Sequence, residues 1–357
     1  MQDKLRTKAA STQDGIKFSL LNFDKFCMER FEGRRSEDII QELHVLDPLK
    51  MEDHAYDVLQ EWVTWNHNIG LAPATIRRYF SGVFRFLNYR GIKITVQEIK
   101  DNIDFPHKIV EERLPMSLEH IQEIFKVANY WKIALYLALL SSGMRIGEAV
   151  AIRKKHLKFV YSKDKQVRTR IDIPANLTKT KTGRSVFISK EAHGYIKNKL
   201  NQLDDDDLVW GVNENKKEAI LAEQVTFGRY LERSGLDDRY ETTNRRKLHL
   251  HSLRSYFFTK ASRLDHNYAQ LMLGHSGYLI REYDHMDLEE KLEMYLKLEP
   301  ELLIDNTQRL KAENEKLEEE KSELEKKIPK LVDEAAERIK QKLLEDGYLQ
   351  ATSLIKK

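Results

Sequence analysis

Six side chains in five short segments are of the types that attack on a phosphodiester requires. In chain order they are Arg145, Lys179, His251 with Arg254, His275 and Tyr283. Guanidinium groups bind phosphate oxygens bidentately and stabilise the charge that develops during phosphoryl transfer. A phenol can act as the nucleophile, while imidazole and ammonium groups move protons. The pattern predicts cutting and rejoining of DNA, with no metal and no other cofactor.

The helices expected around these residues would hold their backbone in place. Residues 133–140 are almost continuously apolar and predict a buried helix, and Gly143 suits a left-handed cap at its end. Arg145 then lies just past that end. His251 and Arg254 are three positions apart, so they share one face of a helix. Beside that face runs an apolar stripe made of Leu250, Leu253, Phe257 and Leu264.

The remaining candidates lie on shorter elements. Residues 168–174 alternate polar and β-branched side chains and predict a strand, and residues 185–189 predict a second one. Lys179 falls in the lysine-rich loop between them. Gly274 is expected to cap a helix and to expose His275. Together with the helices, these elements predict a mainly helical fold with a small β-sheet.

The N-terminal part is expected to be helical throughout, up to about residue 104. Apolar residues recur at helical spacing in residues 18–31, 54–66 and 74–90. Pro73 marks a start and Gly91 a stop for the third of these helices. The following stretch, 105–115, contains two prolines and no clear periodicity, which indicates a linker to a second domain.

The chain has 357 residues, enough for two domains with separate cores. A composition of 41% hydrophobic and 33% charged residues is typical of a soluble protein. No run reaches the roughly 18 apolar residues of a membrane span, and the start lacks a secretory segment. A cytoplasmic location with no membrane partner is therefore expected. Cys27, the one cysteine, excludes a disulfide framework and a multi-thiolate metal site.

The net charge of +3 is small, but acidic residues are absent or rare in three stretches. Residues 62–96 and 242–264 contain none, and residues 149–190 contain only Asp164 and Asp172. Local basic faces of this kind are typical of proteins that bind a phosphate backbone, and they predict strong salt dependence. The expected DNA-binding side chains are Arg77, Arg78, Arg85, Arg90, Lys93, Arg184, Arg245, Arg246 and Lys247.

Four segments resemble, in order, the motif blocks of tyrosine site-specific recombinases, the phage-integrase and Xer group. They are SSGMRIGEAVAI, TKTKTGRSVFI, HSLRSYFFT and LGHSGYLIREY. The resemblance covers roughly residues 116–300, and the segment APATIRRYFSGVFRFLNYRGI is similar to the family's core-binding domain. It implies an all-α, SAM-like core-binding DNA-binding domain (1–104), a linker (105–115), an α+β catalytic domain (116–302) and a helical, coiled-coil-like tail (303–357).

The resemblance also assigns roles. The matching positions are Arg145, Glu148, Lys179, His251, Arg254, His275 and Tyr283. In such a site the two arginines bind the phosphate and the glutamate orients them. The lysine protonates the leaving 5′-hydroxyl, and His251 accepts the proton of the Tyr283 nucleophile. The second histidine donates a hydrogen bond to a phosphate oxygen.

An enzyme of this kind cleaves and rejoins DNA through a 3′-phosphotyrosyl intermediate, which keeps the phosphodiester energy and needs neither metal nor ATP. The implied protein is an integrase-type site-specific recombinase of a mobile genetic element or a chromosome, associated with the nucleoid. It would act on double-stranded DNA as a homo-tetramer on paired specific sites, with a monomer or a dimer as the free form. Two other interpretations stay open: a type IB topoisomerase-like enzyme that relaxes DNA, and a non-catalytic DNA-binding regulator or architectural protein.

Two of the assignments have close competitors. Tyr283 lies eight residues after His275, one short of the common family spacing, and Tyr295 is the alternative nucleophile. The apolar neighbours of Tyr295 favour a place in the core. Lys181 lies two residues from Lys179, and the spacing within the motif favours Lys179.

The tail carries a seven-residue repeat. Its leucines are Leu303, Leu310, Leu317 and Leu324, and the alternate seam positions are Thr307, Asn314, Lys321 and Ile328. The pattern is typical of a coiled coil with one polar row, and it is expected to end at Pro329. In a parallel homodimer, Glu313 would face Glu318. Glu320 would likewise face Glu325, and both pairs would repel. A weak zipper, an antiparallel contact or a helix docked on a neighbouring subunit is therefore expected. The alternative is a solvated charged helix with marginal self-association.

Overall fold

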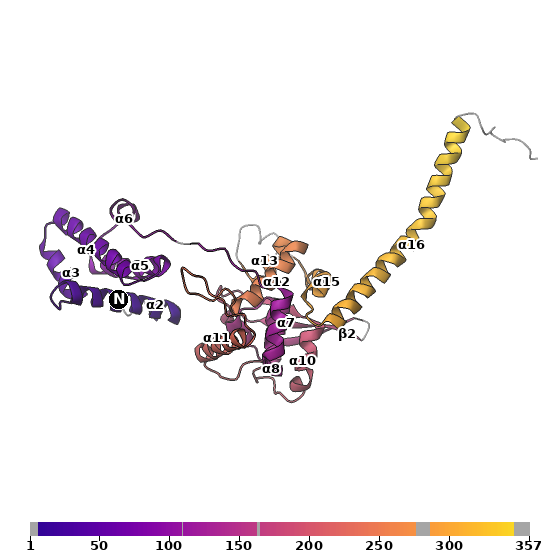
Figure 1. Cartoon of the computed structure of the whole chain (residues 1–357), viewed down its shortest axis with the longest axis horizontal. Coiled ribbons are helices and arrows are strands. Elements are labelled where there is room, and N and C mark those ends of the chain that lie inside the picture. Colours follow the sequence, from indigo (N-terminus) through magenta and orange to yellow (C-terminus); the bar gives the residue numbers. More distant parts are fainter. Residues whose placement is uncertain (1–5, 109, 163–164, 276–285, 346–357) are drawn as a thin grey trace, which may run out of the picture. The chain divides into compact units, whose positions relative to one another are not determined.

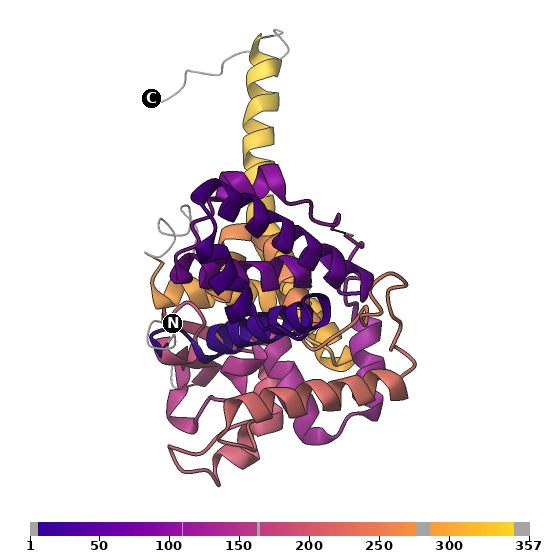
Figure 2. The same cartoon turned by 90° about the vertical axis from the view of Figure 1, so that its left-hand side faces the viewer.

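The computed structural model describes residues 6–108, 110–162, 165–275 and 286–345. The described chain is mainly helical and contains one small antiparallel sheet, which confirms the coarse fold class predicted from the sequence (Figures 1 and 2). Its internal contacts divide it into two units, Met1–Glu112 with Tyr240–Asn244, and Arg113–Arg239 with Arg245–Lys357. Among the described helices, none has the length and apolar character needed to cross a membrane.

The first unit is a set of helices packed on an aromatic core. Its helices are α2 (Ala10–Arg30), α3 (Ser36–Val45), α4 (Pro48–Asn68), α5 (Pro73–Arg90) and α6 (Val96–Asn102). The ring of Trp62 meets Phe23 edge-on at a centroid distance of 5.2 Å and stacks on Phe80 at 6.1 Å. Pro73 begins α5, and Gly91 ends it with a φ of 99°, at the start and stop that the sequence predicted.

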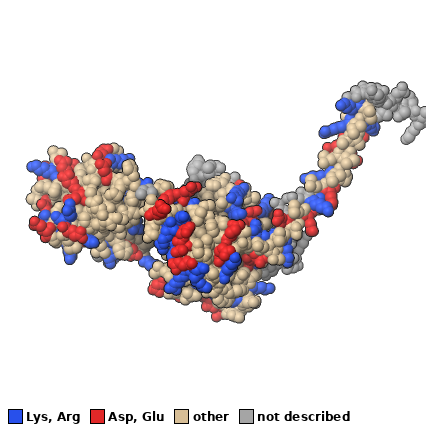
Figure 3. Space-filling view, viewed as in Figure 1, with Lys and Arg blue, Asp and Glu red and all other residues tan. Residues whose placement is uncertain are grey.

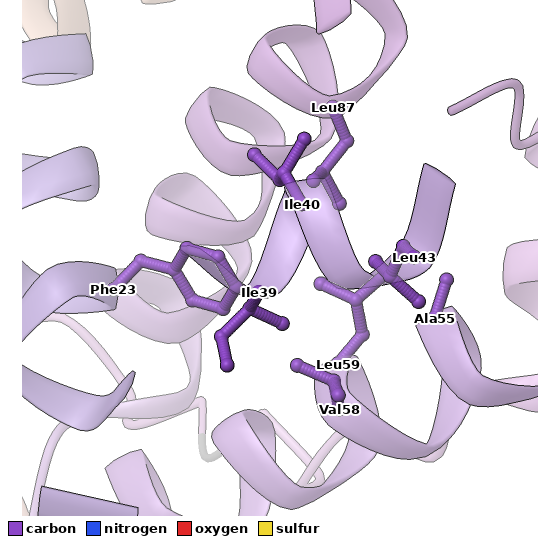
Figure 4. A pocket seen from close by; sticks show the side chains of 8 residues that line it. All are labelled: Phe23, Ile39, Ile40, Leu43, Ala55, Val58, Leu59 and Leu87. Carbon is purple, nitrogen blue, oxygen red and sulfur yellow. The ribbon is translucent and has the colours of Figure 1, made fainter. Parts of the chain in front are cut away.

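A small apolar pocket lies in the core of this unit, between α2, α3, α4 and α5 (Figure 4). Its lining consists of Phe23, Ile39, Ile40, Leu43, Ala55, Val58, Leu59 and Leu87. These side chains bring no titratable group to it, so the pocket belongs to the packing of the core. Cys27 is fully buried in the same core, and burial raises the pKa of its thiol to about 12. The thiol therefore stays protonated and unreactive.

The second unit is built around α8 (Tyr130–Ser142), in which every residue from Ala134 to Ser142 is buried. Helix α8 packs against α10 (Lys190–Leu200), α12 (His251–Leu264) and the last strand of the sheet. A helix that is apolar all round needs such cover on several sides. Besides α16 (Asn306–Glu345), the other described helices of this unit are α7 (Leu118–Val127), α9 (Ile146–Ala149), α11 (Lys216–Arg233), α13 (His266–Leu273) and α15 (Leu288–Leu298).

The sheet of this unit has three antiparallel strands in the order β1, β2, β3. They are β1 (Leu157–Ser162), β2 (Lys165–Ile173) and β3 (Arg184–Ile188), flanked by the 3-10 turns η1 (Lys154–His156) and η2 (Ala175–Leu177). Ile171 pairs with Leu157 on one side and with Val186 on the other. The sequence predicted β2 and β3 but not β1, an edge strand whose exposed Lys158 and Phe159 break the polar and apolar alternation.

Two buried carboxylates hold the segment that follows α15. This segment contains η3 (Glu299–Leu302) and leads into α16 (Asn306–Glu345). Glu191 accepts hydrogen bonds from the amides of Ile304 at 2.8 Å and Asp305 at 3.2 Å. Glu299 accepts one from the Lys190 amide at 2.7 Å and forms an ion pair with Arg168. The chain is thereby tied to the second unit up to the first turn of α16.

Helix α16 differs from the predicted tail at both of its expected limits. Leu303 is only 6% exposed, so the exposed leucine row begins at Leu310 instead. Pro329 lies inside the helix and not at its end. A proline removes one backbone hydrogen bond. The neighbouring Lys, Leu, Glu and Ala residues are strong helix formers, and they carry the helix past this position.

Candidate active site

Arg145 follows a turn that requires glycine. Helix α8 ends at Gly143, whose φ of 65° is left-handed. A Cβ built there would lie 2.5 Å from Phe257 Cδ1 and 2.8 Å from Leu273 Cδ2, so no side chain fits. Arg145 then caps α9, and its amide and guanidinium donate to Glu148 at 2.8 and 3.1 Å. The motif arginine thus lies just beyond a buried helix end, as its sequence position predicted.

Glu148 joins two arginines from separate parts of the chain. It is 1% exposed and accepts two hydrogen bonds from the Arg184 guanidinium, at 3.1 and 2.7 Å. Burial raises the pKa of this carboxyl, but the hydrogen bonds and charges of Arg184 and Arg145 outweigh it, so the pKa lies below its usual range. Glu148 is therefore ionised and fixes the position of the Arg145 side chain.

Arg184 is held on all sides, although the sequence placed it among the DNA-binding residues. Its side chain is 9% exposed, and Nε donates to the Met272 carbonyl at 2.9 Å. Gly274 leaves room for it, since a Cβ there would lie 2.9 Å from Arg184 Cδ. With its donors directed to Glu148 and Met272, Arg184 supports the site from within.

Arg254 is the most deeply placed cation of the site. It is 4% exposed, and its guanidinium donates to the carbonyls of Gly143 and Leu273, the latter at 2.8 Å. Burial, followed by repulsion from Arg145, lowers the pKa of this guanidinium to about 9, so it is charged at neutral pH. Among the described residues, no carboxylate forms an ion pair with it. The charge of the nearby Glu148 offsets part of the cost of burying this guanidinium, and an anionic ligand would offset the remainder.

His275 lies beside Arg254. Its Nδ1 is 2.5 Å from Gln270 Oε1, where the ring N–H donates to the amide oxygen. Nε2 then faces Arg254 Nη2 at 3.4 Å as an acceptor. Burial and the charges of Arg254 and Arg145 lower the pKa of His275. The imidazole is therefore neutral at pH 7 in the free protein.

His251, the first residue of α12, keeps an accessible ring. Within the described part of the chain, nothing forms a hydrogen bond with this imidazole, and the ring of His249 lies 6.2 Å away. Partial burial, then the charge of Arg254, lowers the pKa of His251. A neutral, accessible imidazole beside a buried arginine is suited to accept a proton.

The lysines lie on the loop between η2 and β3 and on a helix facing it. Lys179 is exposed, and Lys181 has a φ of 59° and donates to the Asn176 carbonyl at 3.4 Å. Lys216, at the start of α11, was not predicted. Its Nζ donates to the Leu177 carbonyl at 3.1 Å, and burial lowers its pKa. Only the fold brings Lys216 to this loop, because its sequence context is an ordinary helix start.

Of the two candidate tyrosines, the structure describes Tyr295. Tyr283 lies outside the described residues. Tyr295 is fully buried, and its hydroxyl donates to the Ser141 carbonyl at 3.0 Å. Its ring packs against Phe187 at 5.3 Å, and burial raises the pKa of its phenol well above the ordinary value. Tyr295 occupies a core position in this structure.

The other predicted DNA-binding side chains differ in their contacts within the protein and in their exposure to solvent. Arg77 lies over the Phe105 ring at 4.5 Å, and Arg90 forms an ion pair with Glu37 at 2.7 Å. Arg246 pairs with Glu232. The exposed residues of this set are Arg77, Arg78, Arg85, Lys93 and Arg245. On the face shown in Figure 3, basic and acidic side chains are interspersed.

The residues of this site lie in a segment that matches a known protein family. A family model described as the phage integrase family matches residues 115–289. That segment contains Arg145, Arg184, His251, Arg254 and His275, which α9, β3, α12 and the end of α13 bring together. Residues 115–289 are a domain of the phage integrase family. The chain is a site-specific recombinase of the tyrosine type.

Solved structures similar to this recombinase include three other recombinases. One is the XerH site-specific recombinase bound to palindromic difH substrate, with 21% identity, a TM-score of 0.48 and coverage of 82% of this chain and 81% of that chain. A lambda integrase dimer bound to a COC′ core site has 14% identity, a TM-score of 0.46 and coverage of 80% and 85%. The Tn1549 transposon integrase in complex with transposon right end DNA has 14% identity and a TM-score of 0.42, with coverage of 78% of this chain and 99% of that chain. No curated protein matches significantly. The family model carries the identification.

The lowered pKa of His251 gives the recombinase a defined pH response. In the free protein this pKa is expected below the ordinary value of 6.5. The folded state therefore binds the proton less readily than the unfolded chain. The contribution of His251 to the free energy of unfolding is therefore fully present above pH 6.5 and is lost as the pH falls through the pKa of the folded state. The ring resonances of ¹³C-labelled histidine, assigned with His251→Gln, measure this pKa. A midpoint above 6.5 would contradict the prediction.

Proposed function

We propose that this recombinase cleaves and rejoins double-stranded DNA through a 3′-phosphotyrosyl link to Tyr283, without metal or ATP. The observation that supports this most is the buried guanidinium of Arg254, with two carbonyl partners and no carboxylate in an ion pair among the described residues. Arg145 lies close enough to lower its pKa, so two cations face one locus. A phosphodiester supplies the missing negative charge.

Three groups carry the covalent step. The phenolic oxygen of Tyr283 attacks phosphorus, and the bond from phosphorus to the 5′-oxygen breaks. His251 accepts the phenol proton, because it is neutral at pH 7 and accessible. Lys179 gives a proton to the departing 5′-oxygen. A second DNA 5′-hydroxyl reverses the step, so strand exchange needs no external energy.

The remaining groups bind the phosphate. Arg145 and Arg254 hold its non-bridging oxygens as charge builds in the transition state. Glu148 keeps Arg145 in place through the hydrogen bonds already described. His275 donates to a phosphate oxygen once a proton is at Nε2, which accepts from Arg254 in the free protein. Phosphate binding favours that proton, because an anion raises a nearby imidazole pKa.

The whole chain is then an integrase-type enzyme that holds its DNA with two domains. Residues 1–104 form the SAM-like core-binding domain, 105–115 the linker, 116–302 the catalytic domain and 303–357 the tail. The exposed Arg78, Arg85, Lys93 and Arg245 contact the phosphate backbone. Four copies act on two paired sites, and the DNA substrate places the protein with the nucleoid.

Covalent capture on a library of nicked duplexes of random sequence tests this proposal. A nick close to the cleaved bond lets the short product diffuse away, so the protein stays attached. We expect an SDS-stable adduct that forms in EDTA and without ATP, with a few related sequences enriched in the captured DNA. Capture with no sequence enrichment would indicate a relaxing topoisomerase instead. Specific binding without any adduct would indicate a non-catalytic regulator.

A further inference from the structure

Helix α16 carries a row of exposed leucines along most of its length. Leu310, Leu317, Leu324 and Leu331 recur every seven residues, and each is 55–61% exposed. Ile328 lies next to this row and is 54% exposed. Single exposed leucines are ordinary. A continuous row on one face of a 40-residue helix is what a coiled-coil partner covers.

The second seam row is polar and selects against a parallel pair. Lys321 occupies this row between Asn314 and Ile328. Two parallel copies in register would place each Lys321 ammonium opposite its own copy. They would also place Glu313 opposite Glu318 on both flanks. A parallel arrangement therefore meets repulsion in its seam and along its edges.

An antiparallel pair centred near residue 319 removes these conflicts. In this register Leu317 lies opposite Lys321 of the second copy, whose methylene stem covers the leucine while its charge remains in water. Leu310 lies opposite Ile328 in the same way, and the two-fold axis repeats both contacts.

The flanks of this register are complementary in charge. Lys311 faces Glu325 of the second copy, and Glu313 faces Lys327, each pair occurring twice. These four side chains are all exposed on α16. At the axis Glu318 meets its own copy, which weakens the pair without changing its register. A shift by one heptad toward the C-terminus would place Glu318 against Glu325, so the central register is preferred. Figure 3 shows the alternation of basic and acidic side chains along α16.

We propose that α16 is a homodimerisation helix that pairs with α16 of a second copy in antiparallel orientation, centred near residue 319. Residue 307 of each copy then lies opposite residue 331 of the other copy. At 1.5 Å per residue, the two residues 307 are about 36 Å apart along the helix pair. The two chains are joined tail to tail, and their association does not depend on DNA or on the active site.

Two adjacent lysines provide a matched test on the full chain without DNA. Lys327→Glu places like charges opposite Glu313 at both ends, and the dimer dissociation constant from analytical ultracentrifugation should rise about tenfold. Lys326→Glu, on the outer face, should leave it unchanged. Glu313→Lys should weaken the dimer equally, and the double variant Glu313→Lys with Lys327→Glu should restore it. In a parallel pair, Glu313→Lys would instead strengthen association.

The distance between one labelled position in the two copies reports directly whether the two α16 helices are antiparallel or parallel. A spin label on Gln308→Cys is specific, because the native Cys27 is buried. The antiparallel pair predicts a separation of about 33 Å between the two labelled positions, while a parallel pair predicts about 10 Å. A monomer at all concentrations, equal effects of Lys327→Glu and Lys326→Glu, or the short distance would each overturn the proposal. Because no DNA is present, failure here leaves the cleavage proposal untouched.

Discussion

Replacement of Tyr283 by phenylalanine is expected to abolish covalent attachment to DNA, to below about one thousandth of the wild-type rate. The matched variant Tyr295→Phe should still form the adduct. Tyr283 lies outside the described residues, so the prediction rests on its position eight residues after His275 and on the surroundings of its competitor. The measurement is adduct formation on the nicked substrate enriched from the library, followed on denaturing gels.

The surroundings of Tyr295 make it a poor nucleophile. Its hydroxyl is committed to the Ser141 carbonyl at the end of α8, and its ring is enclosed by the core. Burial disfavours the phenolate, which is the attacking form. To reach a phosphate, Tyr295 would have to leave the core and abandon that hydrogen bond.

The same contacts predict a stability effect for Tyr295→Phe that Tyr283→Phe is not expected to share. Loss of the hydroxyl leaves the Ser141 carbonyl without this donor, at a cost of about 1 to 3 kcal/mol of unfolding free energy. Urea titration measures it. If Tyr295→Phe abolished the adduct while keeping its stability, and Tyr283→Phe still formed the adduct, the nucleophile assignment would be reversed.

The parts of the site that lie close together in the sequence were the ones that sequence alone could predict. His251 and Arg254 share a helix face because they are three residues apart. Arg145 follows a left-handed turn at Gly143 that only glycine can adopt. Helix positions of this kind depend on local geometry. The same holds for β2, in which polar and β-branched residues alternate.

Contacts between distant segments could not be predicted. Arg184 resembled a phosphate contact because it ends a basic loop, yet the fold directs it to Glu148, 36 residues earlier, and to Met272. Lys216 reaches the loop before β3 only because α11 packs there. Leu303 fitted the heptad of the tail, but the segment before α16 is buried against the second unit. Each of these depends on tertiary packing that has no local signature.

Arg254 and Arg184 are two buried arginines whose loss should lower cleavage in both cases but should affect stability differently. Arg254→Met is expected to reduce the cleavage rate about a thousandfold while leaving the unfolding free energy within about 2 kcal/mol of wild type. The variant deprives the Gly143 and Leu273 carbonyls of a donor. It also removes a buried charge that faces Arg145 and that forms no ion pair with a carboxylate of the described residues, and these two effects oppose each other.

Arg184→Met is the matched variant, because it removes a buried guanidinium that is ion-paired. Among the described residues, Glu148 would then keep Arg145 as its one remaining ion-pair partner, at a cost of about 3 to 5 kcal/mol. Cleavage should fall as well, since Glu148 holds Arg145. Adding Glu148→Gln should recover part of the stability but not the activity, because the neutral amide no longer needs a counter-ion.

The comparison separates a guanidinium kept for chemistry from one kept for structure. If Arg254→Met lost as much stability as Arg184→Met, the buried charge would be balanced within the fold, and its place as the phosphate ligand would fail. If Arg254→Met instead retains its stability and loses cleavage, the free protein carries an electrostatic cost that only a bound anion offsets. Thermal unfolding with and without the enriched DNA site then gives the last check. DNA should raise the melting temperature of the wild type by more than that of Arg254→Met, because the variant has lost the charge that the phosphate neutralises.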